Sequence, residues 1–543
     1  MLPKITTALA VFGLVGFQSQ AQLTVQSGAT FFMQTGSQVT VQGDVQNAGT
    51  LNNDGSLRVQ GNYTNTGTYT GVGSAGILEM YGAGDVNLSP GSSSIANLTI
   101  NKTAATDDVT LTASTTVTNG FTFTQGGLTT NPIGTPSVAL ISPATTPYTF
   151  AAGKEVVGRV RRTGWTAGVA RVFNQPNMQV TTTGGTTPSD FTVNMIPNGD
   201  PTQAEREVKR VYGFANTGGS GFTADVRYPY MAGELNTNTE ANLVPWRLVT
   251  AEWNARLTPV TRDAANDWVA TTGVAAADLA QEWKLADPNY TMNVTANLRG
   301  PWTGAAMNTN ISGILPLAQP YNTTPFNYAG TENVGAIPTN VVDWVLIEHR
   351  KPASGLPADA LSATITGRQA GFLLNNGTVV GLDGVTPIKV PIAKQGTAFI
   401  TVRHRNHLGV LSNAIASNAT GNFTNDFTVL ANSYKPAGSP SDPVVLLSGG
   451  VEYGLWAGDA NKNGAVNVTD ANAIKSAIAA SLNGYQFTDV NMSNSINVTD
   501  VNLTKSTISL SGTGSGTNAR SRVDLNNPNI KVTTNIPDPI VEN

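Results

Sequence analysis

Two short stretches near the C-terminus place oxygen-bearing side chains at every second position. The first is DANKNGAVNVTD at 459–470, and the second is DVNMSNSINVTD at 489–500. When a loop curls around an ion, alternate side chains turn inward, so this spacing suits a hard cation held by oxygen ligands. We therefore expect two calcium sites, one in each loop.

Each stretch matches the twelve-residue calcium loop of an EF-hand. In that loop, oxygens at positions 1, 3, 5, 7 and 12 bind the ion, and position 7 contributes its main-chain carbonyl. Gly464 stands at position 6, where the chain turns sharply; the second loop has Asn494 there, and Asn adopts left-handed backbone more easily than most residues. The predicted ligands are Asp459, Asn461, Asn463, Ala465 and Asp470 in the first loop, and Asp489, Asn491, Ser493, Ser495 and Asp500 in the second.

The ligand types predict weak binding. Each loop supplies only two carboxylates, which suggests a dissociation constant on the order of the 10⁻⁴ to 10⁻³ M found for extracellular modules. Ser493 is a poorer ligand than the Asn463 that it replaces, so the second site should be the weaker one. The alternative is an Asx-rich turn without a metal, but two copies in one register, each followed by a similar segment, favour the metal.

A helix is predicted directly after each loop. The segments ANAIKSAI (471–478) and VNLTKSTI (501–508) match at Asn, Lys, Ser and Ile, and Ile474 and Ile478 fall on one helical face. We expect a small calcium-ordered helical module at 455–525, followed by a tail at 526–543.

The pair of units resembles the dockerin-type repeat, a duplicated calcium loop and helix. The resemblance covers residues 458 to about 510 and lies in the motifs D-x-N-x-N-G-x-V-N-x-x-D and D-x-N-x-S-N-x-I-N-x-x-D. It implies that calcium orders the module, and that positions 10 and 11 of each loop contact a cohesin-like partner. Those positions hold Val468, Thr469, Val498 and Thr499.

The N-terminus reads as an export signal, which we assign to residues 1–21. Lys4 precedes an apolar run from Ile5 to Phe17, and small residues then precede Gln22. We expect a secreted protein, extracellular or on the outer cell surface, and no later segment is apolar enough to predict a transmembrane span. The chain has no cysteine, which excludes disulfides and zinc-thiolate sites, and its net charge of -4 argues against a nucleic-acid partner.

Composition predicts a mainly β protein. Charged residues make up 12% of the chain, about half the usual share, and Thr, Asn, Ser and Gly favour strands and turns. VTVQGDVQNAGTL (39–51) aligns with LRVQGNYTNTGTY (57–69), and such a short repeat of strands and turns predicts β-solenoid coils over 22–132. A meandering sandwich is the alternative.

The rest of the chain predicts one or two β-sandwich domains. Strand-like runs between Gly, Asn and Pro turns indicate a β-sandwich region at 133–335, within which only 273–287 has a helical pattern. A second, Ig-like sandwich follows at 336–434, and a Pro- and Ser-rich linker at 435–454.

A wider resemblance extends beyond the two loops. VDWVLIEHR (342–350), ITVRHRNHLGVLS (400–412) and LWAGDANKNG (455–464) are similar to the C-terminal half of secreted, cell-surface multidomain proteins of Bacteroidetes-type bacteria, and 97–128 is similar to their adhesin-like β repeats. The export signal, the 18-residue repeat and the two loops together favour a non-enzymatic protein with a structural or adhesive role at the cell surface or in the matrix. The expected partners are a surface or matrix protein, a polysaccharide, or further copies of the chain.

Three other interpretations stay open. Asp263, Asp267, Asp278 and Glu282 lie near Trp253, Trp268 and Trp283 in the sequence, as in a carbohydrate-active enzyme or a sugar-binding platform. Exposed solenoid edges would suit a self-assembling filament or coat subunit. His404 and His407 could bind a metal with His349 or Glu348, but we expect residues three apart in a strand to face opposite ways.

Overall fold

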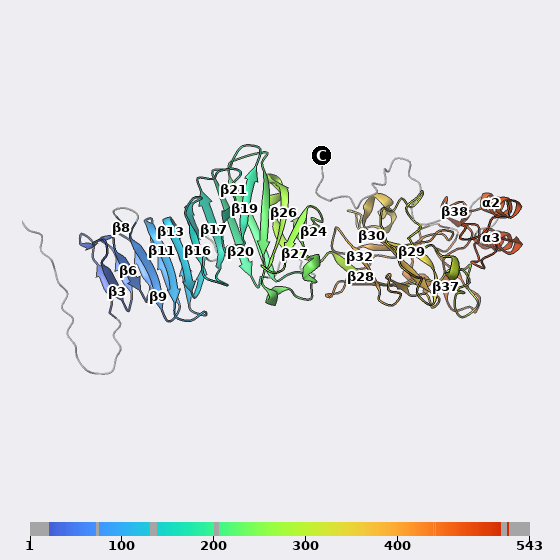
Figure 1. Ribbon diagram of the computed structural model, residues 1–543, viewed down its shortest axis with the longest axis horizontal. Coiled ribbons are helices and arrows are strands. Elements are labelled where there is room, and N and C mark those ends of the chain that lie inside the picture. The colour runs from blue at the N-terminus through green and yellow to red at the C-terminus, as the bar shows by residue number, and fades with distance from the viewer. Residues whose placement is uncertain are drawn as a thin grey trace, which may run out of the picture. The chain divides into compact units, whose positions relative to one another are not determined.

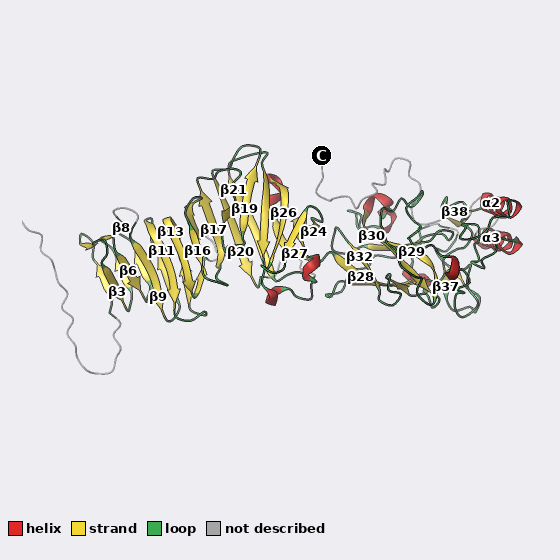
Figure 2. Cartoon of the chain, in the orientation of Figure 1, coloured by secondary structure: helices red, strands yellow, loops and turns green. Residues whose placement is uncertain are grey.

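The computed structural model describes residues 21–71, 75–130, 138–199, 206–437, 439, 441–511 and 519–520. The structure is mainly β, with 44% strand and 10% helix, and it includes a β-solenoid of about 6 turns and a few further sheets (Figure 2). These features confirm the predicted fold class. The predicted signal peptide, apart from Ala21, and the tail lie outside the described residues. The chain divides into two compact units, Met1–Ile196 with Phe214–Thr223 and Pro197–Gly213 with Ala224–Asn543.

The first unit contains the solenoid, whose short strands stack in parallel rows (Figure 1). One row is β1 (Leu23–Val25), β4 (Val45–Asn47), β7 (Tyr63–Asn65), β10 (Val86–Ser89), β12 (Asp108–Leu111) and β14 (Gly127–Thr129). A second is β2 (Thr30–Met33), β5 (Thr50–Asn53) and β8 (Thr68–Thr70). A third is β3 (Gln38–Val41), β6 (Ser56–Val59), β9 (Ile77–Gly82), β11 (Ser94–Lys102) and β13 (Thr115–Gln125).

The repeat in the sequence sets the spacing of the coils. Asn47 and Asn65, 18 residues apart, are buried one above the other, and Asn47 Nδ2 donates to Asn65 Oδ1 at 2.7 Å. Two residues after each Asn comes a Gly at which successive turns meet closely, because a Cβ added at Gly67 would lie 2.1 Å from the carbonyl oxygen of Gly49. The Asn-x-Gly motif therefore makes a stacked turn that a larger residue would obstruct.

Parallel pairing continues beyond residue 132, where we predicted that the repeat region ends. It includes β15 (Ala139–Pro143), β16 (Tyr148–Phe150) and β17 (Val156–Thr163). The direction then changes, because β17 pairs antiparallel with β20 (Asp190–Pro197). The strands β18 (Arg171–Val172) and β19 (Gln179–Thr183) also pair antiparallel.

Further strands follow, most of them in the second unit: β21 (Arg210–Thr217), β22 (Thr223–Pro229), β23 (Val244–Val249), β24 (Glu252–Ala255), β25 (Val260–Asp263), β26 (Trp268–Ala275) and β27 (Glu282–Ala286). The pairs β21–β27, β23–β24, β23–β27 and β25–β26 are antiparallel. The helical prediction at 273–287 is wrong except for the short helix α1 (Ala276–Leu279). Glu282 to Ala286 pair with β21 and β23 instead, so sheet pairing overrides the local helical preference.

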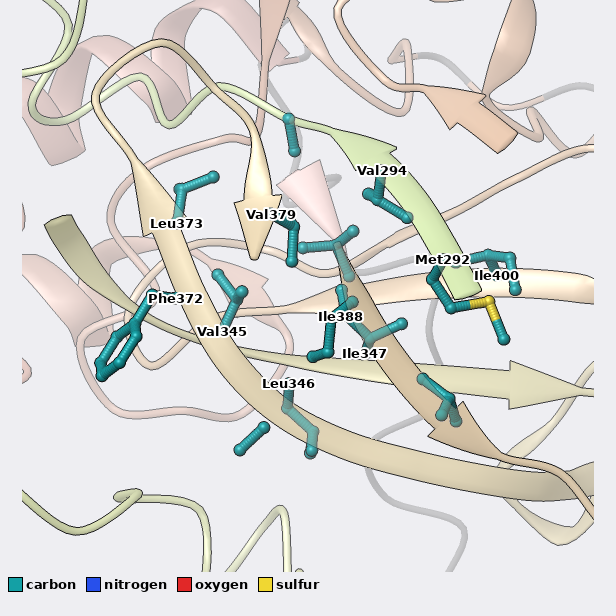
Figure 3. Close-up of a cluster of buried hydrophobic side chains, with 14 of the residues drawn as sticks. Met292, Val294, Val345, Leu346, Ile347, Phe372, Leu373, Val379, Ile388 and Ile400 are labelled. Carbon is teal, nitrogen blue, oxygen red and sulfur yellow. The ribbon is translucent and has the colours of Figure 1, made fainter. Parts of the chain in front are cut away.

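Two sheets face each other across one core in the rest of this unit. The larger has the order β31 (Val379–Val380), β30 (Ile365–Leu374), β29 (Val341–Arg350), β33 (Phe399–Arg403) and β34 (Val410–Leu411). The smaller has the order β32 (Ile388–Pro391), β28 (Asn289–Thr295) and β35 (Asn422–Asp426). Figure 3 shows apolar side chains from both sheets, among them Met292, Ile347 and Ile388, in one cluster.

The limits of this two-sheet body differ from those that we predicted. Strand β28 lies before residue 336, and part of the predicted linker also packs on the body: Val444 is fully buried, and β36 (Val445–Leu446) pairs with β37 (Tyr453–Gly454). The indole N–H of Trp456 donates to the Asp442 carbonyl at 2.9 Å. A Pro- and Ser-rich stretch can lie along the surface of a domain when its few apolar residues are buried in the core of that domain.

The remaining elements are short or C-terminal. Short 3-10 helices cover Ala232–Glu234, Glu240–Asn242, Ser312–Ile314, Pro357–Asp359, Ser362–Thr364 and Leu430–Asn432. The strand β38 (Ala465–Val466) pairs with β39 (Ala519–Arg520), and the helices α2 (Val468–Ala479) and α3 (Val498–Ser511) lie beside each other. None of the helices in the described part of the chain is long and apolar enough to cross a membrane.

Candidate metal centre

Each predicted calcium loop leads directly into a helix. Asn467 is the N-cap of α2, and its side chain accepts the Thr469 N–H at 2.8 Å. The Asp470 carboxylate accepts the Asn467 N–H at 2.9 Å, which completes a capping box. The carboxylate at position 12 therefore belongs to both the loop and the first turn of the helix.

The first loop closes around its two carboxylates. Asp459 accepts the Asn463 N–H at 2.9 Å through Oδ1 and the Gly464 N–H at 3.0 Å through Oδ2. Asp470 Oδ1 accepts the Asn461 N–H at 3.1 Å. Positions 1 and 12 thus fix the backbone of positions 3, 5 and 6, which brings the predicted ligands of this loop together.

The second loop repeats these contacts. Asp489 accepts the N–H groups of Ser493 at 3.0 Å and Asn494 at 2.9 Å, and Asp500 Oδ1 accepts the Asn491 N–H at 3.1 Å. Ser493 Oγ donates to the carbonyl of Ser495 at 3.1 Å. Two oxygens at that separation can both contact one cation at 2.3–2.6 Å, which suits positions 5 and 7 of a calcium loop.

Left-handed backbone recurs at the same places in both loops. Position 6 has a φ of 77° at Gly464 and 67° at Asn494, and position 4 has a φ of 64° at Lys462 and 54° at Met492. Asn at position 6 thus adopts the conformation that the first loop assigns to Gly, as the sequence predicted.

The four loop carboxylates are buried and carry no paired cation. Asp459, Asp470, Asp489 and Asp500 are at most 4% exposed, and no ion pair among the described residues includes them. Burial and the neighbouring Asp470 raise the pKa of Asp459 to about 7, and burial also raises the pKa of the other three carboxyls. A buried carboxylate of this kind needs a counter-charge, and a divalent cation between positions 1 and 12 would supply it.

Neutral oxygens must complete each ligand set. Among the described residues, no group of three or more His, Asp or Glu side chains could hold a metal. Each loop offers two carboxylates with Asn or Ser oxygens and one carbonyl, a hard-oxygen set that fits calcium and does not fit zinc.

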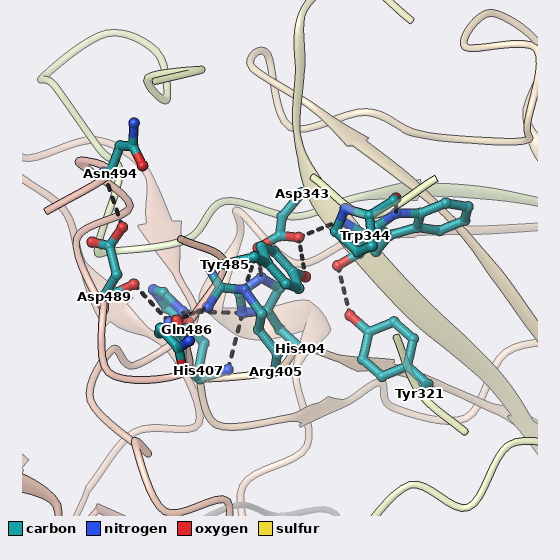
Figure 4. Close-up of polar contacts among 12 residues, drawn as sticks. Tyr321, Asp343, Trp344, His404, Arg405, His407, Tyr485, Gln486, Asp489 and Asn494 are labelled. Atoms are coloured by element: carbon teal, nitrogen blue, oxygen red, sulfur yellow. Dashed lines mark hydrogen bonds and ion pairs between the residues drawn. The ribbon is translucent and has the colours of Figure 1, made fainter. Parts of the chain in front are cut away.

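The module is seated on the two-sheet body, which the sequence analysis did not foresee. Figure 4 shows the contact, in which Arg405 Nε donates to Asp343 Oδ2 at 2.7 Å and Arg405 also donates to the Gln486 carbonyl. Tyr485 Oη donates to Asp343 Oδ1 at 2.6 Å. Arg299 reaches the far helix, where it donates to Thr507 Oγ1 at 2.7 Å. In the sequence, the charged and polar motif RHRNH at 403–407 was the feature that could have indicated this contact.

The histidines of that motif come together at a turn. Strand β33 ends at Arg403, so the chain turns, and the rings of His404 and His407 lie 4.9 Å apart. Opposite faces are expected only where the strand continues through both residues. His404 Nε2 donates to Asp343 at 3.2 Å, and the Gly300 N–H donates to His407 Nε2 at 3.0 Å. His349 contacts Phe423 instead, with ring centroids 5.1 Å apart.

The predicted partner-binding positions are on the surface of the module. Val468 is 64% exposed and Val498 63% exposed, and Thr469 and Thr499 are also exposed. In α2 the predicted apolar face is only half right, because Ile474 is buried and Ile478 is 37% exposed. Ala471 and Ala477 complete the buried face.

Two of the three tryptophans of the enzyme interpretation are buried. Trp253 and Trp283 are buried, which leaves them no face for a sugar, and Asp278 forms an ion pair with Arg247. Trp268 is stacked by the guanidinium of Arg227 at 4.1 Å. Burial raises the pKa of Asp267, and the nearby Glu240 adds to this effect.

No protein-family model matches this chain, and neither does any curated protein or any solved structure.

Proposed function

We propose that this protein is an exported structural or adhesive component of the cell surface or matrix, and that two calcium ions order its C-terminal module. The observation that carries the proposal is the pair of matching loops, each with two buried carboxylates and no cationic side chain paired to them among the described residues. The N-terminal sequence, which reads as an export signal, supports an extracellular setting.

In the proposed sites, five groups of each loop hold one ion. The position 1 and 12 carboxylates balance its charge, and the side chains at positions 3 and 5 and the carbonyl at position 7 add neutral oxygens. Binding would remove the repulsion between Asp459 and Asp470 and fix the capping box that starts α2. Calcium would thereby stabilise the loop and the helix together.

The solenoid suits the same role. Stacked coils give an elongated surface from a simple repeat, and each coil needs only its neighbours for burial. A partner at the exposed Val468 and Val498 would bind to a module that calcium keeps folded.

The test is calcium titration of the full chain by calorimetry, with melting measured in calcium and in chelator. We expect heat of binding at submillimolar to millimolar calcium and a higher melting temperature in its presence. Asp459→Ala with Asp489→Ala should abolish both effects, whereas Asp359→Ala, which removes an exposed carboxylate, should leave them intact. Unchanged melting of the native chain in chelator would contradict the proposal.

A further inference from the structure

A single residue of the two-sheet body contacts both calcium loops. Asn406 lies in the turn after β33 and is completely buried. Its carbonyl accepts the N–H groups of Gly458 and Asp459, both at 3.1 Å. Its side-chain Nδ2 donates to the carbonyl of Asp489 at 2.9 Å. Asp459 and Asp489 are position 1 of the first and the second loop, so one residue holds the first ligand of each.

The side chain of Asn406 cannot rotate freely. Its Oδ1 accepts from Nδ1–H of His407 at 2.8 Å, and His407 Nε2 accepts the Gly300 N–H at 3.0 Å. His404 Nδ1 lies 3.4 Å from the Asn406 N–H. Buried partners on both sides therefore fix which amide atom faces Asp489.

A close backbone approach holds the second loop in place. A Cβ added at Gly300 would lie 1.9 Å from the Val490 carbonyl oxygen, so this part of the loop lies directly on the body. Arg405, which precedes Asn406, stacks on Tyr485 with its guanidinium 4.2 Å from the ring centroid. Direct contacts thus join Asp489 to the turn at 404–407, and this turn to Asp459.

We propose that Asn406 is a positioning residue that couples the two calcium loops, so that an ion in one loop raises the affinity of the other. The inference rests on the proposed calcium binding. An ion in the second loop fixes Asp489, which fixes the Asn406 amide and the carbonyl that places Asp459. By reciprocity, an ion in the first loop favours the second to the same extent.

The contact of Asn406 with the second loop can be removed while its contact with the first loop is kept. The link to the first loop is made by the main-chain carbonyl, which every substitution at 406 retains, whereas the link to the second loop is made by the side chain. Asn406→Ala therefore removes the contact to Asp489, together with the acceptor for His407, and keeps the main-chain link to Asp459. Asn406→Asp is a second variant of nearly the same size, which keeps the acceptor for His407 and loses the donor.

The experiment measures calcium affinity of the first loop in the full chain while the second loop is disabled by Asp500→Ala. In the native background, Asp500→Ala should weaken the first site by about 5-fold or more, the lower end of typical allosteric couplings. In the Asn406→Ala or Asn406→Asp background, the same change should alter that affinity by less than about 2-fold.

Asn308→Ala is the matched control. Asn308 Nδ2 lies 3.4 Å from the Asn491 carbonyl and so contacts the second loop from the same body, but none of its hydrogen bonds reaches the first loop. This variant should keep the coupling. Equal weakening in all backgrounds, or two independent sites in the native chain, would overturn the inference and leave calcium binding intact. Absence of any calcium binding would overturn the proposed function as well.

Discussion

Buried carboxylates in the second unit behave in two opposite ways, depending on their neighbours. Asp343 and Glu348 are completely buried, and burial alone would raise their pKa. Arg405 and His404 outweigh this effect at Asp343 and hold its pKa at about 2. Arg350 and Arg403 do the same at Glu348, whose pKa is also about 2. The loop carboxylates have no such guanidinium partner in an ion pair of the described residues, and burial raises their pKa. Arginine and histidine side chains of the protein balance the charge of Asp343 and Glu348. A cation from solution would balance the charge of the loop carboxylates.

The left-handed position 6 of the first loop gives a residue-level prediction. Gly464→Ala should lower the stability of the calcium-loaded module by about 1–2 kcal/mol, because a Cβ makes left-handed backbone costly. Gly464→Asn should cost less, since the second loop already carries Asn there. Thermal melting in excess calcium measures both. Equal losses for the two variants would contradict the conformational explanation.

The buried His349 should make the free energy of unfolding depend on pH. Burial lowers its pKa to about 3 from an ordinary value of about 6.5. The unfolded chain therefore binds the proton more readily, so the stability from neutral His349 is complete above pH 6.5 and is lost as the pH falls towards 3. The loss at pH 5 should be about 2 kcal/mol.

The check is urea unfolding between pH 7 and pH 5, with a variant that cannot titrate. His349→Asn should reduce the pH slope, because it keeps a group that can bond with Thr366 and removes the proton-binding ring. Some slope should remain, since burial also lowers the pKa of His404 and His407. An unchanged slope in the variant would show that His349 does not contribute.

At the scale of elements, the solenoid depends on a ladder of buried amides. Asn65 accepts from Asn47 and donates to the Pro90 carbonyl at 2.9 Å and to Ser93 Oγ at 3.1 Å, so it joins three successive coils. Such a residue specifies the spacing of the coils as well as their stability, because an amide displaced by one position would lose its partners.

Asn65→Ala should therefore destabilise the coils by about 2–4 kcal/mol, since it leaves buried partners unsatisfied. Thr64→Ala, an exposed change on the same strand, should have little effect. Hydrogen exchange of the strands β4, β7 and β10 is the appropriate measurement. Equal protection in both variants would mean that the ladder is not essential to the stack.

For the whole molecule, the division into two compact units predicts two separate unfolding transitions. The loops belong to the second unit, which also contains the two-sheet body. Because Arg405, Asn406 and Arg299 bind the module to that body, calcium should stabilise the body as well as the helices.

Calorimetric scanning of the full chain should show this division. We expect one transition that shifts upward with calcium and another that does not, and hydrogen exchange should place β29 in the first and β11 in the second. Protection of β29 that is the same in calcium and chelator would mean that the module does not transmit its stability to the sheets.

The sequence by itself determined the local features. The Asn-x-Gly repeat predicts stacked coils, and the alternating oxygens predict two loops with their following helices, because each depends on residues within about 20 positions of one another. Sequence reasoning also anticipated Asn494 in left-handed backbone. Calcium binding itself stays a prediction.

Only the tertiary structure decided what lies against these elements. The strand at Glu282–Ala286 has a helical sequence pattern, but its pairing with β23 is non-local and outweighs that preference. His404 and His407 meet because the strand ends before them. Asn406 reaches both loops because Asp459, 53 positions further along the chain, and Asp489, 83 positions further along, return to it. Such contacts follow from packing of the whole unit, which no local pattern encodes.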